Sequence, residues 1–439
     1  MQFNIPDTDQ TRVVIVGGGF AGLTLARKIA RSNFQVVLVD KNNYHQFQPL
    51  FYQVAMAGLE PSSIVFPFRK LFQKRKNVFL RMTSVQSVDV TRQEITTDIG
   101  NLHYDYLVLA MGANTNFYGN EQVQRHAIPM KSVSEALFLR NAIFQDYERA
   151  LTSEQDAQKQ RLLDIVVVGG GPTGVEIAGS LAEMKRTIIP KEYHDLKSEE
   201  IKIHLIQGDE RLLNTMSPQA SAGAEKFLLE LGVQLWMDKV VTDYDGETVT
   251  INDGSIIKSC KVIWAAGVIG NTISGLPPEV YARGNRLKVN ACNQVEGFQN
   301  IIAIGDIAYQ TEEKFPNGHP QVAQVAIQQG KLLAQNLLVW QKGDLAHQKV
   351  FKYTDLGSMA TIGRHRAVVD LPFWRFQGAF AWLVWLFVHL FSILGAKNKL
   401  FIFVNWVWNY ITYDQSLRLV IKPWAKPTVA AETRLTQKV

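Results

Sequence analysis

Two glycine-rich segments with nearly the same pattern constrain this chain more than any other feature. The first, VVIVGGGFAGLTLA, runs from Val13 to Ala26, and the second, VVVGGGPTGVEIAG, runs from Val166 to Gly179. Each begins with an apolar run typical of a buried strand and continues into a helical pattern. Strand, loop and helix in that order are typical of parallel sheets covered on both faces. The repetition therefore predicts an α/β chain in which one folding unit is used twice.

The glycine spacing within each segment is that of a Rossmann-like dinucleotide site. In this pattern the first glycine makes a tight turn, the second lets the backbone approach a pyrophosphate, and the third allows close helix packing. The phosphates then lie at the helix N-terminus, where free N–H groups favour negative charge. Asp40 ends the next strand of the first unit, where an acid is expected to bond ribose hydroxyls. The glycines are Gly17, Gly19 and Gly22 in the first loop, and Gly169, Gly171 and Gly174 in the second.

A third segment distinguishes the two units. IIAIGDIA places Asp306 directly after a buried run, with Gly305 before it. In flavoproteins of this plan such an aspartate bonds the ribityl chain or a phosphate of FAD. Two Rossmann-like units predict two dinucleotides, so we expect non-covalent FAD in the first unit and a nicotinamide cofactor in the second.

Composition excludes several other classes of protein. Hydrophobic residues make up 46% and charged residues 20% of the 439 residues, which is an ordinary globular composition. The formal net charge of +6 suits anionic cofactors or an anionic membrane surface, without the clustered basic footprint of a nucleic-acid binder. Cys260 and Cys292 form neither a CxxC pair nor a metal spacing, so we expect no disulfide framework, no metal and a cytoplasmic compartment. The N-terminal segment predicts no signal peptide.

Changes in pattern along the chain predict its division into domains. The polar stretch ERALTSEQDAQKQR, Glu148 to Arg161, is interpreted as the end of a helix and a surface connection before the second unit. Four segments are expected: 1–118, the first part of an FAD-binding domain; 119–285, the NAD(P)H-binding domain; 286–345, the second part of the FAD-binding domain; and 346–439, a C-terminal membrane-anchoring domain.

The C-terminal segment is unusually aromatic. FWRFQGAFAWLVWLFVHLFSILG, Phe373 to Gly395, and FIFVNWVWNYITY, Phe401 to Tyr413, are apolar runs interrupted by polar groups. The clean part of the first, Gly378 to Leu394, has 17 residues, at the lower edge of a membrane-spanning length. We expect two amphipathic helices lying in the membrane interface; one spanning helix or a buried dimer interface remain as alternatives. The tryptophans expected at the interface are Trp374, Trp382, Trp385, Trp406 and Trp408.

Two further segments carry a resemblance to a known family. Beside the two loops stand DKNNYHQFQPLFYQVA, Asp40 to Ala55, and QVAQVAIQQGKLLAQNL, Gln321 to Leu337. With the aromatic C-terminus they resemble type II NADH dehydrogenase, the single-subunit NADH:quinone oxidoreductase of respiratory membranes. The resemblance implies electron transfer from NADH through FAD to membrane ubiquinone or menaquinone without proton pumping. It also implies a peripheral, monotopic protein on the cytoplasmic face of the cell membrane, with a homodimer as an open question.

The resemblance also assigns roles to individual positions. Glu176 would lie near the nicotinamide and flavin, where it orients the carboxamide or moves a proton toward the quinone. Gln324 would line the quinone pocket, and Lys399 would border it; with Glu176 they form the expected catalytic set. The implied FAD contacts are Gly17, Gly19, Gly22, Asp40, Lys41, Val85, Ala110, Gly112, Asp306 and Ala323. The implied NADH contacts are Gly169, Gly171, Gly174, Glu176, Gln207 and Gly267, and the implied quinone contacts are Gln324, Gln328, Lys399 and Ile402.

One departure from the family pattern concerns the nicotinamide donor. Gln207 stands where the family usually has an acid that bonds the NADH ribose. An acid repels a 2′-phosphate and a glutamine does not, so NADPH remains open as a donor. Asp209 disfavours a phosphate, whereas Arg211 is close enough in sequence to favour one. NADH is the expected donor.

Two alternative functions remain open at this point. One is a relative of sulfide:quinone oxidoreductases, which use cysteines beside the flavin; neither cysteine here is placed like a redox pair. The other is an NADH-sensing flavoprotein of the apoptosis-inducing-factor type, which binds a partner instead of reducing quinone. The apolar C-terminus and the AQxAxQxG segment favour the enzyme.

Overall fold

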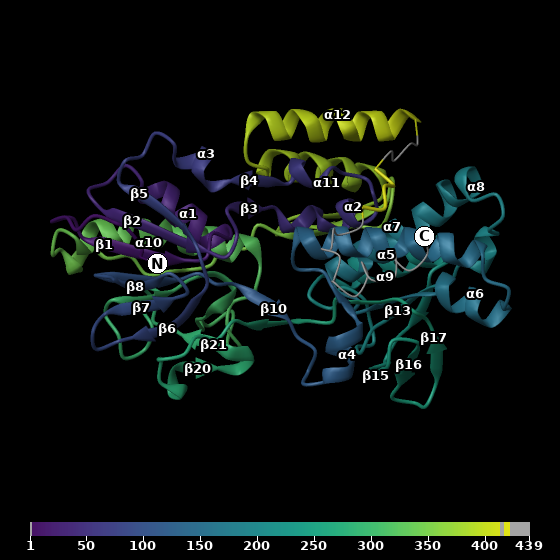
Figure 1. The fold of residues 1–439 in the computed structure, drawn as a ribbon, viewed down its shortest axis with the longest axis horizontal. Helices are drawn as coiled ribbons and strands as arrows, with labels where there is room; N and C mark the ends of the chain where they lie inside the picture. The colour runs from purple at the N-terminus through teal and green to yellow at the C-terminus, as the bar shows by residue number, and fades with distance from the viewer. Residues whose placement is uncertain (1, 413–416, 422–439) are drawn as a thin grey trace, which may run out of the picture.

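The centre of the first lobe is a parallel five-stranded sheet in the order β22-β9-β1-β2-β5 (Figure 1). The computed structural model describes residues 2–412 and 417–421. The strands are β1 (Arg12–Val16), β2 (Gln35–Asp40), β5 (Val78–Met82), β9 (Tyr106–Leu109) and β22 (Ile301–Ala303). Because β22 comes from a distant part of the chain and pairs in parallel with β9, two separate chain segments build this lobe.

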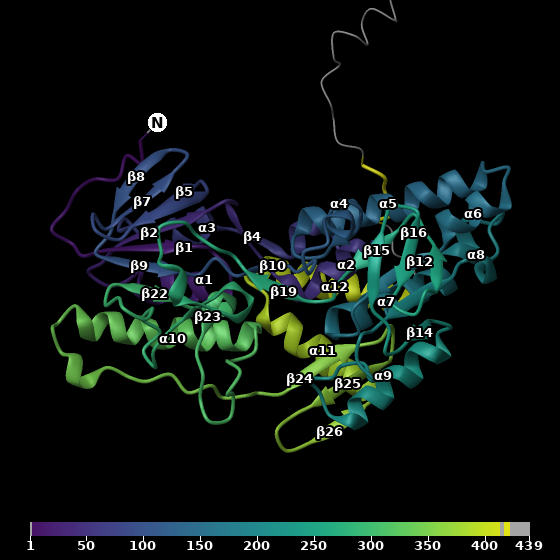
Figure 2. The same ribbon diagram turned by 90° about the horizontal axis from the view of Figure 1, so that it is seen from below.

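Two helices pack closely on this first sheet. Helix α1 (Phe20–Ile29) follows the first glycine loop, and α10 (Ala323–Trp340) lies alongside it (Figure 2). Their close approach depends on Gly330, since a Cβ at that position would lie 2.7 Å from the carbonyl oxygen of Ala21. Any side chain there would push the two helices apart.

The second lobe repeats the plan with a parallel sheet in the order β11-β18-β12-β13-β14. Its strands are β11 (Ile128–Pro129), β12 (Ile165–Val168), β13 (Ile203–Ile206), β14 (Gln234–Trp236) and β18 (Val262–Trp264). Its main helices are α5 (Val133–Leu151), α7 (Pro172–Thr187) and α9 (Pro218–Glu230). Strands β12 and β13 are fully buried, as their continuous apolar sequences require. The two parallel sheets confirm the predicted α/β class with two dinucleotide-type units.

Smaller elements connect and flank the lobes. Strand β10 (Ala113–Thr115) pairs antiparallel with β19 (Val268–Gly270), where the chain passes between the lobes (Figure 1). The other antiparallel strands are β3 (Tyr44–Gln46), β4 (Val65–Pro67), β6 (Val85–Asp89), β7 (Glu94–Thr97), β8 (Gly100–His103), β15 (Val241–Tyr244), β16 (Thr248–Ile251), β17 (Ile256–Lys258) and β20 (Tyr281–Ala282). Strand β21 (Arg286–Lys288) pairs with β20 and with β23 (Ala308–Tyr309). The short helices are α2 (Phe51–Ala55), α3 (Phe68–Phe72), α4 (Glu121–His126) and α8 (Ile189–Glu192).

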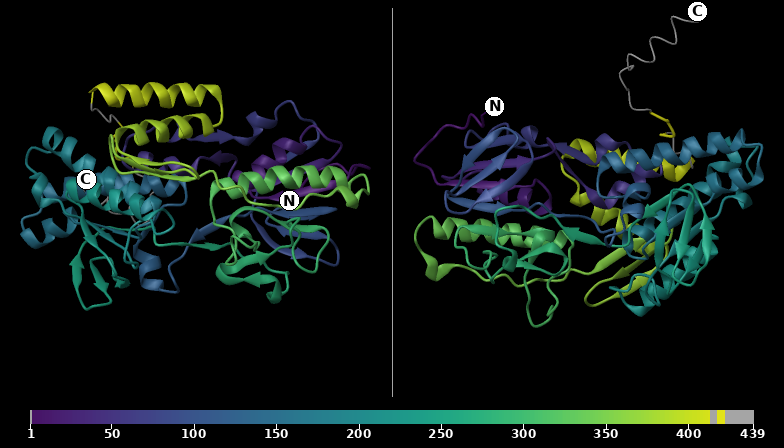
Figure 3. Two further views of the ribbon diagram at one scale, coloured as in Figure 1. Left: turned by 180° about the vertical axis from the view of Figure 1, so that it is seen from behind. Right: turned by 60° about the horizontal axis from the view of Figure 1, so that its bottom comes forward.

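The C-terminal region forms a small sheet and two helices. Strands β24 (Ser358–Thr361), β25 (Ala367–Asp370) and β26 (Arg375–Gln377) are antiparallel and pack on α7 and α9 of the second lobe. Helices α11 (Ala379–Ser392) and α12 (Ala396–Thr412) then lie along one face of the molecule (Figures 1 and 3). Among the described residues, no helix is long and apolar enough to cross a membrane.

The structure differs from the sequence-based expectations in two places. The stretch from Glu148 to Arg161, expected to be a surface connection after a helix end, contains most of a helix of its own, α6 (Asp156–Leu163). Only Leu162 and Leu163 of that helix are buried, so its sequence carries almost no apolar periodicity. Trp385, expected at a membrane interface, lies instead on the buried face of α11.

Candidate functional site

The first glycine loop has the geometry that its spacing predicts. Gly17 has a φ of +103°, and a Cβ there would lie 2.3 Å from the carbonyl oxygen of Ala110 at the end of β9. A Cβ on Gly22 would lie 2.0 Å from the oxygen of Gly17, so the helix can approach the loop only without a side chain. Gly19, by contrast, faces open space and begins α1 without a side-chain cap. The N-terminus of α1 thus leaves backbone N–H groups and room for a phosphate.

The second loop reproduces this geometry position by position. Gly169 has a φ of +108°, and a Cβ there would lie 2.5 Å from the oxygen of Ala265 after β18. A Cβ on Gly174 would lie 1.8 Å from the oxygen of Gly169. Gly171 again faces open space and begins α7 without a side-chain cap. Both loops therefore fit a pyrophosphate by the same physical means.

The residue at the end of the second strand closes each loop. Asp40 accepts a hydrogen bond from the backbone N–H of Gly18 at 2.6 Å, through its Oδ2. Gln207 accepts one from the backbone N–H of Gly170, also at 2.6 Å, through its Oε1. Gln207 therefore holds its loop as an acid would, without supplying an acid's charge. Burial raises the pKa of the Asp40 carboxyl, while N–H groups from Gly18 and Asn42 partly offset that rise.

A negative charge nevertheless stands beside Gln207. The Nε2 of Gln207 donates to Oδ2 of Asp209 at 2.7 Å, and Asn214 donates to the same oxygen at 2.6 Å. Arg211 is turned away, because its guanidinium donates to the carbonyl oxygens of Asn214 and Met216. The arginine that could have bound a 2′-phosphate is thus occupied by backbone, and the carboxylate is held in place.

The turn that carries Asp306 packs against the first loop. Gly305, with a φ of +77°, places this turn between α1 and α10, and its N–H donates to the buried Gln329 at 2.7 Å. Burial raises the pKa of Asp306, and the positive charges of Lys131 and Arg286 lower it in part. A desolvated carboxyl beside the N-terminal end of α1 fits the expected contact with a polar chain of FAD.

The remaining residues expected to contact the dinucleotides lie at different positions around the two loops. Ala110 meets Gly17 directly, and Gly112, with a φ of +68°, faces open space two residues further on. Lys41 is exposed just after β2, whereas Val85 lies half-buried in β6. Gly267 follows β18 with a φ of +150°, so the chain turns there beside the second loop.

The glutamines at the start of α10 have partners that the sequence did not predict. Oε1 of Gln324 accepts hydrogen bonds from the hydroxyl of Tyr353 and the N–H of Leu356, and its Nε2 donates to the oxygen of Gly357 at 2.7 Å. Gln328 bonds both backbone groups of Thr354 through its amide. Both side chains therefore tie the incoming C-terminal segment to α10, and each amide nitrogen makes one such bond, with Gln324 standing at the helix start beside Ala323.

Glu176 is the most perturbed acid of the second unit. It lies buried in α7, against the Thr361 backbone and the Trp385 indole, both of which favour its charged form. Burial outweighs them and raises its pKa to about 8. Burial, and to a smaller extent the Glu176 carboxyl, raises the pKa of Tyr52 in α2. The carboxyl is therefore mostly neutral at pH 7.

The expected quinone residues on α12 are held against α11. Lys399 donates from Nζ to the oxygen of Phe391 at 2.8 Å and lies over that residue's ring. Ile402 is completely buried. His389 was not among the residues expected from the sequence. Its ring stacks on Trp385 with ring centroids 3.9 Å apart, and burial lowers the pKa of His389 to about 4. The only sequence signal for it was one histidine in an apolar run.

Two family models match the chain. The model described as pyridine nucleotide-disulphide oxidoreductase matches residues 11–330, and the NDH2 C-terminal domain matches residues 356–412. The chain is 34% identical over 411 residues to the type II NADH:quinone oxidoreductase NdhA of Mycobacterium tuberculosis, covering 90% of this chain and 86% of that protein.

Solved structures share the fold at lower identity. The structure of NDH2 from Plasmodium falciparum in complex with NADH superposes with a TM-score of 0.85 at 22% identity, covering 94% of this chain and all of that one. The sulfide:quinone oxidoreductase of Aquifex aeolicus has a TM-score of 0.68 at 18% identity, covering 94% of this chain and 96% of that one. At these identities both likenesses establish the architecture alone.

Proposed function

The chain belongs to the pyridine nucleotide-disulphide oxidoreductase family and, within it, to the type II NADH:quinone oxidoreductases, and we propose that its two glycine loops divide the reaction between FAD and NADH. The enzyme oxidises NADH and reduces a quinone. The observation that carries the division is the Gly305–Ile307 turn, which brings Asp306 to the first loop. The second loop has Glu176 in its helix instead.

The first lobe has groups suited to both the pyrophosphate and the hydroxyl groups of FAD. The N-terminus of α1 and open space at Gly19 receive the pyrophosphate, and Asp40 and Asp306 provide carboxylate acceptors for hydroxyl groups. When bound, FAD supplies the two-electron redox chemistry, and the protein orients it and separates the two substrates. The family is usually FAD-dependent, which agrees with this assignment.

The second lobe favours NADH over NADPH. The amide of Gln207 donates a hydrogen bond to the Asp209 carboxylate. A fixed negative charge therefore lies next to the strand end where a 2′-phosphate would lie. Arg211 is bound to the backbone carbonyls of Asn214 and Met216 and to the hydroxyl of Ser221. Like charges about 4 Å apart cost about 1 kcal/mol in bulk water and about 4 kcal/mol near a protein surface, a range that includes the roughly 1.4 kcal/mol of a tenfold change in affinity.

Replacing this charge tests the assignment. Asp209→Asn keeps the hydrogen-bonding shape and is expected to improve kcat/KM for NADPH relative to NADH about tenfold. Gln207→Glu adds an acid at the strand end and is expected to shift the ratio toward NADH. Asp243→Asn, a charge removed from β15, is the matched control. Unchanged NADPH use in Asp209→Asn would refute the role of that carboxylate.

A membrane surface suits the face formed by α11 and α12. This face is exposed and strongly apolar, although neither helix is long enough to span. Buried apolar area and interfacial aromatics are what hold a helix flat in a bilayer interface. The exposed side chains on this face include Phe380, Leu383, Phe387, Phe391, Leu400, Phe403, Val404 and Trp408.

Quinone would reach the flavin beneath these two helices. Lys399 and Ile402 lie where α12 meets α11, and we propose that they border its path together with Gln324 at the start of α10. Gln328, one turn further along α10 and bound at both ends of its amide to Thr354, is proposed as a further residue on this path. An uncharged amide and a lysine stem are compatible with an apolar channel.

Quinone turnover on vesicles tests the whole proposal. NADH oxidation should require a lipophilic quinone and should rise when the protein is bound to lipid. Reducible flavin without quinone turnover would favour the NADH-sensing alternative. The sulfide alternative lacks a close cysteine pair, since Cys260 and Cys292 are both free and burial raises the pKa of each thiol.

A further inference from the structure

Tyr118 stands at the edge of the second lobe with most of its ring in solvent. It follows β10 by three residues, where the chain passes between the lobes (Figure 1), and its exposed fraction is 67%. Its φ is +52°, in the left-handed region that side chains other than glycine rarely adopt. Burial therefore does not explain why the ring is held there, and backbone strain of this kind gathers at functional sites.

Both ends of this residue are fixed to the end of β18. The hydroxyl of Tyr118 donates to the carbonyl oxygen of Ala266 at 2.7 Å, and its backbone N–H donates to Oδ1 of Asn116 at 2.8 Å. The N–H of Asn116 in turn donates to the oxygen of Gly267 at 3.0 Å. The oxygen of Asn116 accepts a bond from the indole of Trp264 at 2.7 Å. These bonds hold the exposed ring in one position relative to the strand end.

The fit between this ring and the strand end is close. A Cβ on Gly267 would lie 2.6 Å from the Tyr118 hydroxyl, so the hydroxyl reaches Ala266 only because Gly267 has no side chain. Gly267 is among the residues expected to contact NADH, and Tyr118 is not. The contact therefore brings an unassigned aromatic ring to the nucleotide side of the strand.

The order of the strands indicates which half of the nucleotide would meet the ring. Ligands of parallel α/β sheets bind outside the carboxyl ends of the strands. Strand β12 leads into the glycine loop that fits the pyrophosphate, and β13 and β18 lie on either side of β12. Gln207 directly follows β13, on the side where the adenosine ribose is expected. The other half of the molecule, which carries the nicotinamide, would therefore pass the end of β18 beside Tyr118.

We propose that Tyr118 is a binding residue for the nicotinamide half of NADH, and that its bond to Ala266 holds the ring in the orientation for contact. An aromatic ring supplies a large contact area for few rotatable bonds. Because this ring is ordered before the nucleotide arrives, binding does not have to immobilise it. The inference rests on the proposed function, since it requires NADH in the second lobe.

Two ligands that differ only in the nicotinamide ring test the proposal. NAD⁺ and ADP-ribose share the adenosine, the pyrophosphate and the second ribose, and neither reduces the flavin. Their dissociation constants would be measured by calorimetry on the FAD-loaded protein in detergent.

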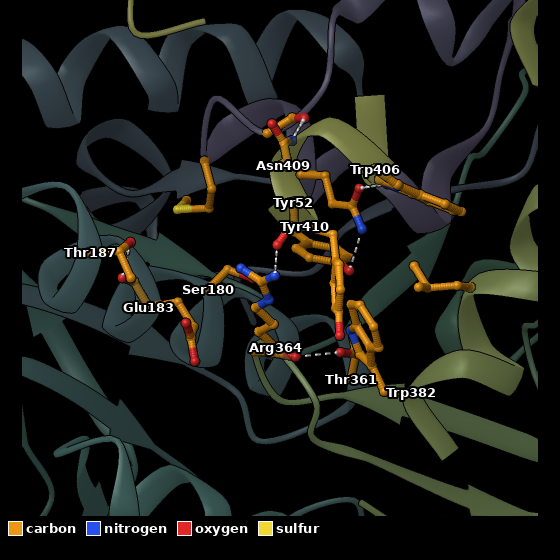
Figure 4. Close-up of a pocket in the computed structure, with 15 residues that line it drawn as sticks. Tyr52, Ser180, Glu183, Thr187, Thr361, Arg364, Trp382, Trp406, Asn409 and Tyr410 are labelled. Atoms are coloured by element: carbon orange, nitrogen blue, oxygen red, sulfur yellow. Dashed lines mark hydrogen bonds between the residues drawn. The ribbon is translucent and has the colours of Figure 1, made fainter. Parts of the chain in front are cut away.

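Two variants separate the ring from its tether. Tyr118→Ala removes the ring, whereas Tyr118→Phe keeps the ring and removes its bond to Ala266. The matched control is Tyr410→Ala, which removes a tyrosine ring that is 48% exposed. Tyr410 lines a pocket between α7 and the two C-terminal helices, away from the end of β18 (Figure 4).

The expected result is a loss confined to NAD⁺. Tyr118→Ala should weaken NAD⁺ binding about tenfold and leave ADP-ribose within twofold of the wild type. Tyr118→Phe should weaken NAD⁺ binding about threefold, because the ring remains but one hydrogen bond no longer orients it. Tyr410→Ala should change neither ligand by more than twofold.

Three results with Tyr118→Ala would overturn the proposal: unchanged NAD⁺ binding, an equal loss with both ligands, and tighter NAD⁺ binding. The last would show that the ring obstructs the site. If Tyr118→Ala does not fold, Tyr118→Phe is decisive, since a loss with NAD⁺ alone supports the contact and any other result overturns it. A wild-type protein that binds neither ligand would refute the proposed placement of NADH itself, and this inference with it.

Discussion

Replacing Glu176 with glutamine should change how stability depends on pH. Burial raises the pKa of this carboxyl from its ordinary value of 4.5 to about 8. The folded protein therefore binds the proton more tightly than the unfolded chain does. Stability contributed by the neutral acid is complete below pH 4.5, declines as the pH rises through the interval, and is lost above pH 8.

The size of the effect follows from that interval. At about 1.36 kcal/mol per pH unit, the full difference corresponds to roughly 5 kcal/mol. An unfolding entropy of about 2.1 cal/mol/K per residue makes this roughly 5 °C in Tm for a chain of this length. Glutamine stays neutral at every pH, so Glu176→Gln should match the wild type near pH 5 and exceed its Tm by several degrees at pH 9.

The assay is thermal unfolding of the FAD-loaded protein in detergent, with both proteins measured from pH 5 to pH 9. Thr187→Val, on the same face of α7 but further from the site, is the control for losing a polar side chain from this helix without changing the buried carboxyl. A Tm difference between Glu176→Gln and the wild type that stays constant across this range would refute the burial argument. A wild type that gains stability toward pH 9 relative to the variant would reverse its sign.

Three further predictions concern the loops, the membrane face and a buried ion pair. Gly22→Ala places a Cβ 2.0 Å from a carbonyl oxygen and should yield protein without flavin. Gly174→Ala places one at 1.8 Å in the second loop and should keep the flavin but lose its reduction by NADH. Absorbance spectra recorded after NADH and then after dithionite distinguish these two outcomes. Phe387→Ser with Phe403→Ser removes two side chains exposed by 61% and 51%, and should weaken vesicle binding more than tenfold in a sedimentation assay. Lys261→Met leaves the largely buried Asp146 on α5 with the exposed Arg149 as its remaining ion-pair partner, and should cost about 3 kcal/mol in denaturant unfolding, the lower end of the range for a broken buried pair.

The parts of the site that depend on local chain geometry were predictable from the sequence. The steric need for glycine at Gly17, Gly22, Gly169 and Gly174 arises from contacts within the strand–loop–helix unit and one neighbouring strand. Such contacts recur wherever the spacing recurs, so the motif predicts them. The parallel sheets followed from continuous apolar runs for the same reason.

The parts that depend on distant packing were not predictable. Glu176 is buried against Thr361 and Trp385, which stand more than 180 residues later in the chain. The partners of Gln324 belong to a segment without regular structure, and no pattern marks them. Gln207 and Asp209 are close in sequence, but the sequence shows only that the usual acid is replaced by a glutamine. The hydrogen bond that holds the Asp209 carboxylate beside Gln207 is visible only in the structure.

Anaerobic reduction and reoxidation of the flavin follow both halves of the reaction in one experiment. The purified protein would be mixed with NADH, and the flavin absorbance band would be followed before and after a short-chain ubiquinone or menaquinone is added. NADH should bleach the flavin band quickly, NADPH should bleach it more slowly, and quinone should restore it fully. Bleaching without recovery would contradict quinone reduction, and no bleaching with either nucleotide would contradict hydride delivery from the second glycine loop.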